Sequence, residues 1–151
     1  MDSFIPVIYE KQYETSLFAF LEICLPESGR ALGLSGRHAF YLDIPRHFRV
    51  FWCMFDGDAI VGTVGIRDAN AGACELKSLY LLEKYHGKGY GRRMLETALD
   101  FAKKAGYRRM YLDSLSTSTR AIRLYRRAGF TDTERYNDAE RSDVFMVKEL
   151  Q

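Results

Sequence analysis

The chain has 151 residues, of which 47% are hydrophobic, and its formal net charge at pH 7 is +2. This length and composition predict one globular domain over residues 1–151, built around a single core. There is no apolar run of the roughly 20 residues that span a membrane, and no secretory signal, so we expect a soluble, cytoplasmic protein without a membrane partner.

Cysteine and histidine show neither the spacing of a metal site nor that of a disulfide framework. The cysteines lie on apolar stretches, which predicts buried thiols and no metal site. The residues concerned are Cys24, Cys53 and Cys74, and His38, His47 and His86.

The first third of the chain predicts a short strand followed by helical segments. Residues 4–10 (FIPVIYE) are typical of a strand, and residues 11–25 have apolar side chains at helical spacing. Residues 30–47 mix glycine, proline and aromatic side chains, which predicts a loop holding a second short helix.

The middle of the chain predicts three consecutive strands. Their apolar runs cover residues 49–55, 59–67 and 73–82, and Asp56-Gly57-Asp58 joins the first two. An Asp-Gly pair between two apolar runs is a strong hairpin signal.

The last third alternates helices and strands. Apolar residues recur at helical spacing from Gly91 until Gly106, and again through Ala121 until Gly129, after a Ser/Thr cluster that offers N-cap residues. Strands are predicted at 107–113, 130–136 and 143–150. The element order is then β-α-α-β-β-β-α-β-α-β-β, which predicts an α/β (α+β) fold with a mixed, centrally parallel sheet flanked by helices, and not a doubly wound one.

The basic residues are concentrated in one segment. Residues 84–127 contain twelve basic and three acidic side chains, a net charge of +9, which leaves −7 for the rest of the chain. Such a segment suits a polyanionic ligand, although solvated helix faces explain part of the charge. No nucleic-acid-binding motif accompanies it, so we expect no nucleic-acid partner.

A glycine-rich stretch within this segment is the main functional signal. It lies between a predicted strand and a predicted helix and consists of His86, Gly87, Lys88, Gly89, Tyr90, Gly91 and Arg92. Glycines let a ligand approach the backbone, and the free N–H groups of a helix start bind phosphates. A glycine-rich turn without a ligand is the alternative. The spacing fits neither a dinucleotide-binding fingerprint nor an ATP-binding loop.

The stretch LYLLEKYHGKGYGRRML (79–95) resembles the cofactor motif of the GNAT superfamily of acyl-CoA N-acyltransferases, with His86 where that motif has Arg or Gln. The stretch AIRLYRRAGF (121–130) resembles the second motif of that family. The order of predicted elements is also similar over essentially the whole chain.

The resemblance implies an N-acetyltransferase that uses acetyl-CoA as cosubstrate. It implies that main-chain groups of Leu79, Tyr80 and Leu81 pair with the pantetheine amides and that Gly87 to Arg92 hold the pyrophosphate. His86 can still donate a hydrogen bond to phosphate, although it is shorter than Arg and only partly charged. Ser118 stands where relatives often carry an Asn that contacts the cofactor.

Two side chains are candidates for acid and base catalysis by the same resemblance. Tyr125 matches a tyrosine that protonates the departing CoA thiolate, and the alternative is a core aromatic. Glu75 lies where some relatives carry the base, and the alternative is an ordinary strand glutamate. Regular alternation predicts that Glu75 shares its face with Lys77, Leu79 and Leu81.

By the same resemblance, residues 30–47 and 136–142 are expected to border the acceptor. We expect this acceptor to be a primary amine of a small molecule, with an amino-acid-like amine as one candidate. Polar and aromatic candidates in these two segments are Arg37, His38, Tyr41, Arg46, Tyr136, Asn137 and Asp138. Alternatives are a non-catalytic acyl-CoA-binding regulatory domain and an enzyme that acetylates a protein or peptide amine. We expect a monomer or a homodimer.

Overall fold

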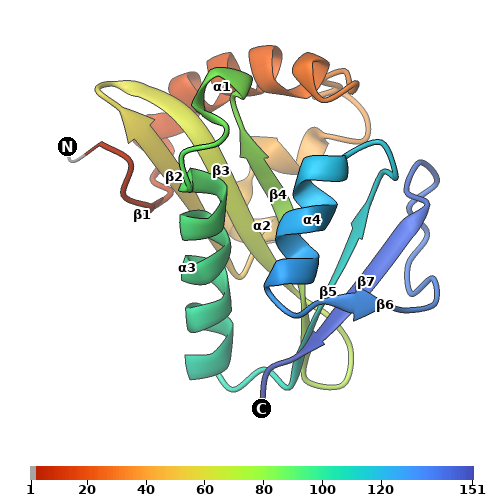
Figure 1. Ribbon diagram of the computed structural model, residues 1–151. Helices are drawn as coiled ribbons and strands as arrows, with labels where there is room; N and C mark the ends of the chain where they lie inside the picture. The colour runs from red at the N-terminus through yellow and green to blue at the C-terminus, as the bar shows by residue number, and fades with distance from the viewer. Residues whose placement is uncertain (1–2) are drawn as a thin grey trace.

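A seven-stranded sheet lies at the centre of the computed structural model, which describes residues 3–151, and helices cover both faces of the sheet (Figure 1). The strand order is β1-β2-β3-β4-β5-β7-β6, and β4 with β5 is the parallel pair among antiparallel neighbours. This arrangement confirms the predicted mixed sheet with a parallel centre. The strands are β1 (Val7–Ile8), β2 (Val50–Asp56), β3 (Ala59–Asp68), β4 (Ala73–Leu81), β5 (Arg109–Ser114), β6 (Thr131–Asp132) and β7 (Val144–Glu149).

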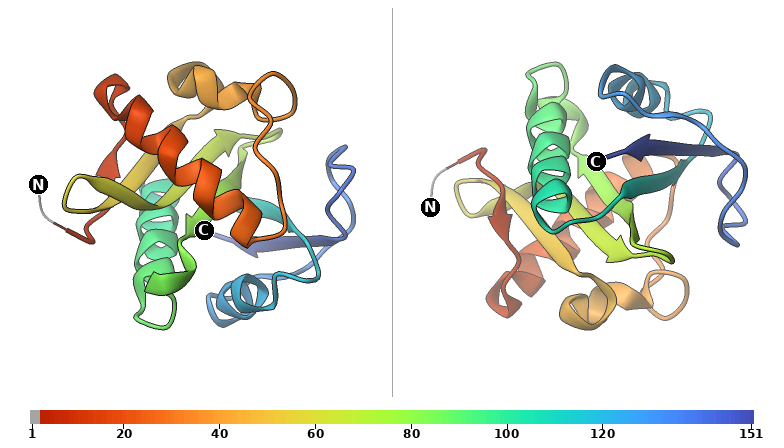
Figure 2. Two further views of the ribbon diagram at one scale, coloured as in Figure 1. Left: turned by 90° about the horizontal axis from the view of Figure 1, so that it is seen from above. Right: turned by 90° about the horizontal axis from the view of Figure 1, so that it is seen from below.

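The helices are distributed over the two faces of the sheet. They are α1 (Glu14–Glu27), α2 (Ile44–His47), α3 (Tyr90–Lys104) and α4 (Thr119–Arg127), with short 3-10 turns η1 (Lys11–Tyr13), η2 (Ala39–Leu42) and η3 (Glu83–Tyr85). Helix α1 crosses one face beside η2 and α2, whereas α3 and α4 lie on the other face (Figure 2).

Apolar side chains from both helical layers form one core with the sheet. Leu17, Leu21 and Leu25 of α1 are fully buried on one side, and Met94 and Leu95 of α3 are buried on the other. The predicted burial of the three cysteines is confirmed, and all three are free thiols. Among residues 3–151, no helix is long and apolar enough to cross a membrane.

The predicted strand 130–136 is wrong beyond its start. Strand β6 contains only Thr131 and Asp132, and the chain then leaves the sheet edge. The reason is Tyr136, whose ring packs 4.7 Å from that of Tyr111 and 5.9 Å from that of Phe145, between centroids. These contacts bring the β6–β7 loop across the sheet face instead of continuing the ladder.

Strands β4 and β5 diverge after a short parallel contact. Their pairing joins residues 73–75 to residues 109–111, with Glu75 opposite Tyr111 as the last pair. Beyond that point β4 continues to pair with β3 and β5 continues to pair with β7, so the two strands splay apart (Figure 1). Glu75 therefore lies at the vertex of this splay.

A β-bulge interrupts β4 on its way to the glycine-rich loop. Ser78 and Leu79 together face the single residue Val64 of β3, and Ser78 has a φ of 56°, which is unusual for a residue other than glycine. The Thr63 hydroxyl donates to the Ser78 carbonyl at 2.7 Å, and the Tyr41 hydroxyl lies 2.7 Å from Ser78 Oγ. These bonds hold the bulge in place.

The bulge overturns the prediction that Glu75, Lys77, Leu79 and Leu81 share one face. Glu75, Lys77 and Tyr80 pair with every second residue of β3 and therefore share a face, whereas Leu81 pairs with the intervening set. The inserted residue shifts the alternation by one. The face of Glu75 and Tyr80 is the one that α1 and η2 cover.

Candidate active site

The glycine-rich loop forms an open N-terminus for α3. Gly87 and Gly89 have φ values of 81° and 86°, and Gly89 is the N-cap of the helix. A Cβ added at either position would meet no atom within 4 Å. The first N–H groups of a helix lack intrahelical partners, so this open end can bind an anion such as a pyrophosphate.

Aromatic contacts hold the loop, and its cations remain near solvent. The Tyr90 ring stacks on Phe4 with centroids 4.4 Å apart. Arg92 pairs with Glu96 at 2.8 Å on the exposed side of α3, whereas Lys88 is exposed and forms no ion pair with any described residue. Lys88 is therefore free to approach a bound phosphate.

His86 turns back toward β4. Its Nε2 lies 3.0 Å from the carbonyl oxygen of Leu81, and because a carbonyl only accepts, Nε2 donates. This bond connects the loop to the end of β4. It also uses the Leu81 carbonyl, one of the main-chain groups in the segment predicted to pair with pantetheine.

Tyr125 of α4 lies beside both the glycine-rich loop and the splay. Its neighbour Leu124 packs on Gly91, because a Cβ built on Gly91 would lie 3.6 Å from Leu124 Cδ2. The Tyr125 side chain is buried and packs on Phe130 at 5.9 Å between centroids. Its hydroxyl has no hydrogen-bond partner among residues 3–151. Burial raises the pKa of Tyr125, so this hydroxyl remains protonated at neutral pH.

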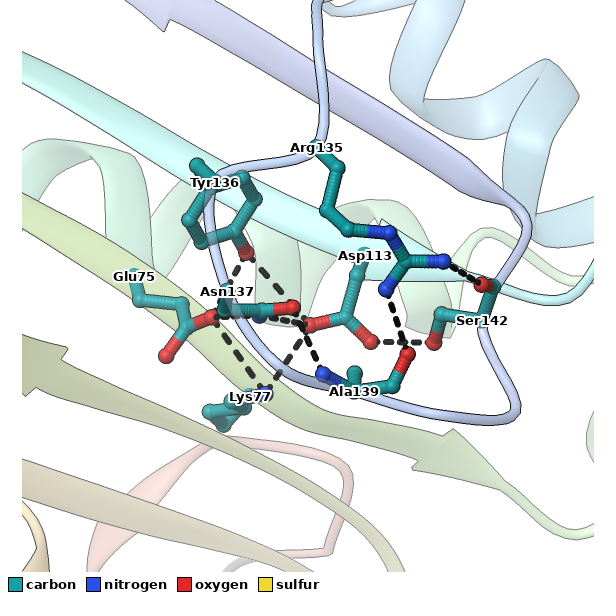
Figure 3. Close-up of polar contacts among 8 residues, drawn as sticks. All are labelled: Glu75, Lys77, Asp113, Arg135, Tyr136, Asn137, Ala139 and Ser142. Carbon is teal, nitrogen blue, oxygen red and sulfur yellow. Dashed lines mark hydrogen bonds and ion pairs between the residues drawn. The ribbon is translucent and has the colours of Figure 1, made fainter.

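Glu75 and Asp113 form a pair of carboxylates (Figure 3). They lie on the face of the sheet opposite to α3 and α4. Lys77 Nζ lies 3.3 Å from Glu75 Oε2 and 3.0 Å from Asp113 Oδ2. Both carboxylates are largely buried, with side chains 12% and 11% exposed. The shared lysine offsets the repulsion between two close negative charges.

Two residues of the β6–β7 loop, Tyr136 and Asn137, complete this cluster. The Tyr136 hydroxyl donates to Glu75 Oε2 at 2.6 Å, and Asn137 Nδ2 donates to Glu75 Oε2 at 2.9 Å and to Asp113 Oδ2 at 2.8 Å. Burial and the charge of Glu75 raise the pKa of Tyr136, which keeps it a donor. The donors converge on Oε2 and leave Oε1 of Glu75 without a partner among the described residues.

The acidity of Asp113 reflects two opposing effects. Burial would raise its pKa, but the Lys77 cation and hydrogen bonds from Ser142 and Asn137 together hold the pKa below the ordinary aspartate value. Asp113 is therefore a fixed negative charge at neutral pH.

Some predicted acceptor residues have structural contacts instead. The ring of His38 is buried and its Nδ1 accepts a hydrogen bond of 2.9 Å from the Gly33 N–H, and Tyr41 supports the bulge. Ser118 is the N-cap of α4 but makes no side-chain capping bond. Tyr136 and Asn137 both donate hydrogen bonds to Glu75.

Asp113 was not identified from the sequence. In the observed register, with Glu75 opposite Tyr111, Asp113 lies on the face of Glu75. The sequence pattern alone does not fix that register.

Known proteins similar to this chain share its fold and family. The model of the acetyltransferase (GNAT) family matches residues 13–130. The uncharacterized N-acetyltransferase YsnE of Bacillus subtilis is 29% identical over 129 residues, which cover 83% of this chain and 81% of that protein. Several other curated relatives are matched over only 40% to 50% of their own length.

Solved structures agree with this assignment at the level of the fold. A GNAT-family acetyltransferase of Staphylococcus aureus Mu50 superposes with a TM-score of 0.88 at 19% identity, covering 97% of this chain and 98% of that one. A putative acetyltransferase of Salmonella typhimurium, solved with its cofactor acetyl-CoA, gives a TM-score of 0.72 at 19% identity, covering 97% and 93%. The family match extends from α1 through α4 and includes the open glycine-rich loop. The chain belongs to the acetyltransferase (GNAT) family.

Proposed function

We propose that this protein transfers the acetyl group of acetyl-CoA to a primary amine of a small molecule, by direct attack in a ternary complex. Its membership of the acetyltransferase family supports the reaction class. The observation that carries the proposal is that Glu75 lies where β4 and β5 diverge, on the face that α1 covers, whereas Tyr125 belongs to α4 on the other face.

The cosubstrate would lie along the splay. The pyrophosphate would meet the N–H groups at the start of α3, between Gly87 and Arg92, with Lys88 beside it. The pantetheine would then run past Leu79 and Tyr80, and the thioester would reach the vertex near Glu75. Acetyl-CoA would thus approach from the side of α3 and α4, and the amine from the side of α1.

The chain's own residues would move two protons during the transfer. Glu75 would take a proton from the ammonium of the acceptor, directly or through water, through its unpartnered Oε1. The neutral nitrogen then attacks the thioester carbonyl, so that a C–N bond forms and the C–S bond breaks. Tyr125, which burial keeps protonated, would give its proton to the departing thiolate. The nitrogen's second proton then leaves to solvent.

The fixed cluster around Glu75 supports its role as the base. Lys77, Tyr136 and Asn137 all contact Oε2, so the carboxylate has one orientation and its other oxygen has no partner among the described residues. Pre-positioning of this kind lowers the cost of bringing reacting groups together.

Initial-rate kinetics of CoA thiol release, with a panel of small primary amines, test the proposal. Direct transfer in a ternary complex predicts intersecting double-reciprocal lines, together with no change in the intact mass of the protein after incubation with acetyl-CoA alone. Parallel lines with an acetylated protein would contradict direct attack. Acetyl-CoA binding without thiol release for any amine would contradict turnover.

A further inference from the structure

Arg30 is a half-buried cation at the splay that the proposed chemistry does not use. It follows the C-terminal end of α1, and its guanidinium carbon lies 5.6 Å from the centroid of the Tyr80 ring. Tyr80 shares its face of β4 with Glu75 and Lys77. Arg30 therefore lies on the side from which the acceptor would approach.

This cation has no counterion of its own. No acidic side chain among residues 3–151 lies within 4 Å of Arg30, and its one side-chain hydrogen bond is a contact of 3.4 Å from Nη1 to the Ser28 carbonyl. Lys77, which is buried to a similar degree, contacts two carboxylates. Arginine is rarely buried without a partner, so a missing anion is the simplest complement for Arg30.

The charge of Arg30 affects the pKa of two tyrosines, Tyr125 and Tyr80. Burial raises the pKa of Tyr125, and Arg30 opposes that rise. Burial likewise raises the pKa of Tyr80, and Arg30 opposes that rise too. The negative charge of Asp113 has the opposite effect to Arg30 and raises the pKa of both tyrosines. Arg30 and Asp113 thus have opposite effects on the pKa of Tyr125.

We propose that the acceptor is a primary amine that also carries an anionic group, a carboxylate or a phosphate ester, and that Arg30 binds this anion. The inference rests on the proposed acetyl transfer and names the substrate class of the same site. The carboxylates of Glu75 and Asp113 attract the ammonium, while the planar guanidinium pairs with two oxygens of the anion. A zwitterion therefore matches the distribution of charge in the site.

The phosphates of acetyl-CoA are the competing anion for Arg30. Their expected position is the N-terminus of α3, which packs on the other face of the sheet from α1. The two sources differ in a measurable way, because loss of a cofactor contact raises the KM for acetyl-CoA whereas loss of an acceptor contact does not.

Matched acceptor pairs provide the test. Rates of CoA thiol release are measured for L-amino acids and their carboxamides, and for O-phosphoethanolamine and ethanolamine, with wild type, Arg30→Gln and Arg30→Lys. Rates are measured as a function of pH for both members of each pair and divided by the fraction of unprotonated amine, so that their different amine pKa values do not create the difference. Arg108→Gln, at an exposed arginine just before β5, is the control for loss of one positive charge.

We expect wild type to prefer the anionic member of at least one pair by about 10-fold to 100-fold in kcat/KM, the factor of a charge-assisted hydrogen bond. Arg30→Gln should remove that preference with little change in the KM for acetyl-CoA, Arg30→Lys should retain part of it, and Arg108→Gln should behave as wild type. The pair that shows the preference identifies carboxylate or phosphate.

Equal use of charged and uncharged members by wild type would overturn the inference while leaving acetyl transfer intact. An unchanged preference in Arg30→Gln, or a raised KM for acetyl-CoA instead, would also overturn it. Absence of thiol release with every amine, although acetyl-CoA binds, would contradict the proposed function itself and this inference with it.

Discussion

Tyr136 donates a hydrogen bond of 2.6 Å to Oε2 of Glu75, although the two residues are 61 positions apart in the chain. The bond anchors the β6–β7 loop over the vertex at which β4 and β5 diverge. It therefore couples the position of the candidate base to the segment expected to border the acceptor.

Replacing Glu75 with glutamine should keep acetyl-CoA binding and lower the rate most at neutral pH. The loss should be partly recovered at higher pH, where the amine loses its proton without help. The measurement is the pH dependence of thiol release, with Glu149→Gln as control because Glu149 is an exposed partner of Arg109. A variant with the rate and pH profile of wild type would assign the base elsewhere or to solvent.

The Asp113→Asn variant should lose about 1–3 kcal/mol of unfolding free energy at neutral pH, the usual contribution of hydrogen bonds to a buried charge. The folded state lowers the pKa of Asp113, so its contribution is present above the ordinary value of 3.8 and disappears as the pH falls through the lowered pKa. The difference between wild type and variant should therefore shrink below that pH.

Urea unfolding at several pH values measures this difference. Asp132→Asn is the control, because Asp132 is exposed and pairs with Arg126 on the surface, where a pair contributes less than about 1 kcal/mol. A difference that stays constant down to pH 2 would exclude an ionic role for Asp113 in the cluster.

Gly91→Val should reduce the rise in melting temperature that acetyl-CoA or CoA causes in the wild type. A ligand that binds only the folded state stabilises it by mass action, and a branched side chain at Gly91 would crowd the pyrophosphate. A Cβ there meets only Leu124 at 3.6 Å, so the fold itself tolerates the change. Gly36→Val, in the loop before η2, is the control. An unaltered shift in Gly91→Val would remove the cofactor assignment.

Tyr125→Phe should bind acetyl-CoA nearly as well as wild type and turn over more slowly, by about 10²-fold to 10⁴-fold, as expected for loss of one general acid. The ring and its packing on Phe130 remain, and the hydroxyl has no partner within the described chain whose loss would destabilise the fold. Tyr107→Phe, at an exposed contact with Asp68, is the control. Wild-type rates with both a good and a poor acceptor would leave Tyr125 as a core residue.

Local patterns predicted most of the fold. The three central strands and helices α3 and α4 lie where alternation and helical spacing place them, because each buries one regular face. The β4 bulge escaped prediction because it depends on Tyr41 and Thr63, which contact Ser78 only in the folded chain. A bulge of this kind leaves no periodic signal.

The candidate site also has one part that the sequence predicts and another that depends on tertiary packing. The glycine-rich loop is a contiguous stretch, so its position before α3 followed from the sequence. The cluster of Glu75, Lys77 and Asp113 joins two strands whose register is set by tertiary packing. Arg30 likewise meets Tyr80 only because α1 crosses the sheet.

Simultaneous quantification of released CoA and N-acetylated amine, by thiol titration and mass spectrometry, tests acetyl transfer most directly. With acetyl-CoA and a panel of primary amines, wild type should release one CoA for each acetylated acceptor, and Tyr125→Phe should form both products more slowly at the same ratio. Thiol release without acetylated amine, or no release with any amine despite acetyl-CoA binding, would contradict acetyl transfer at this site.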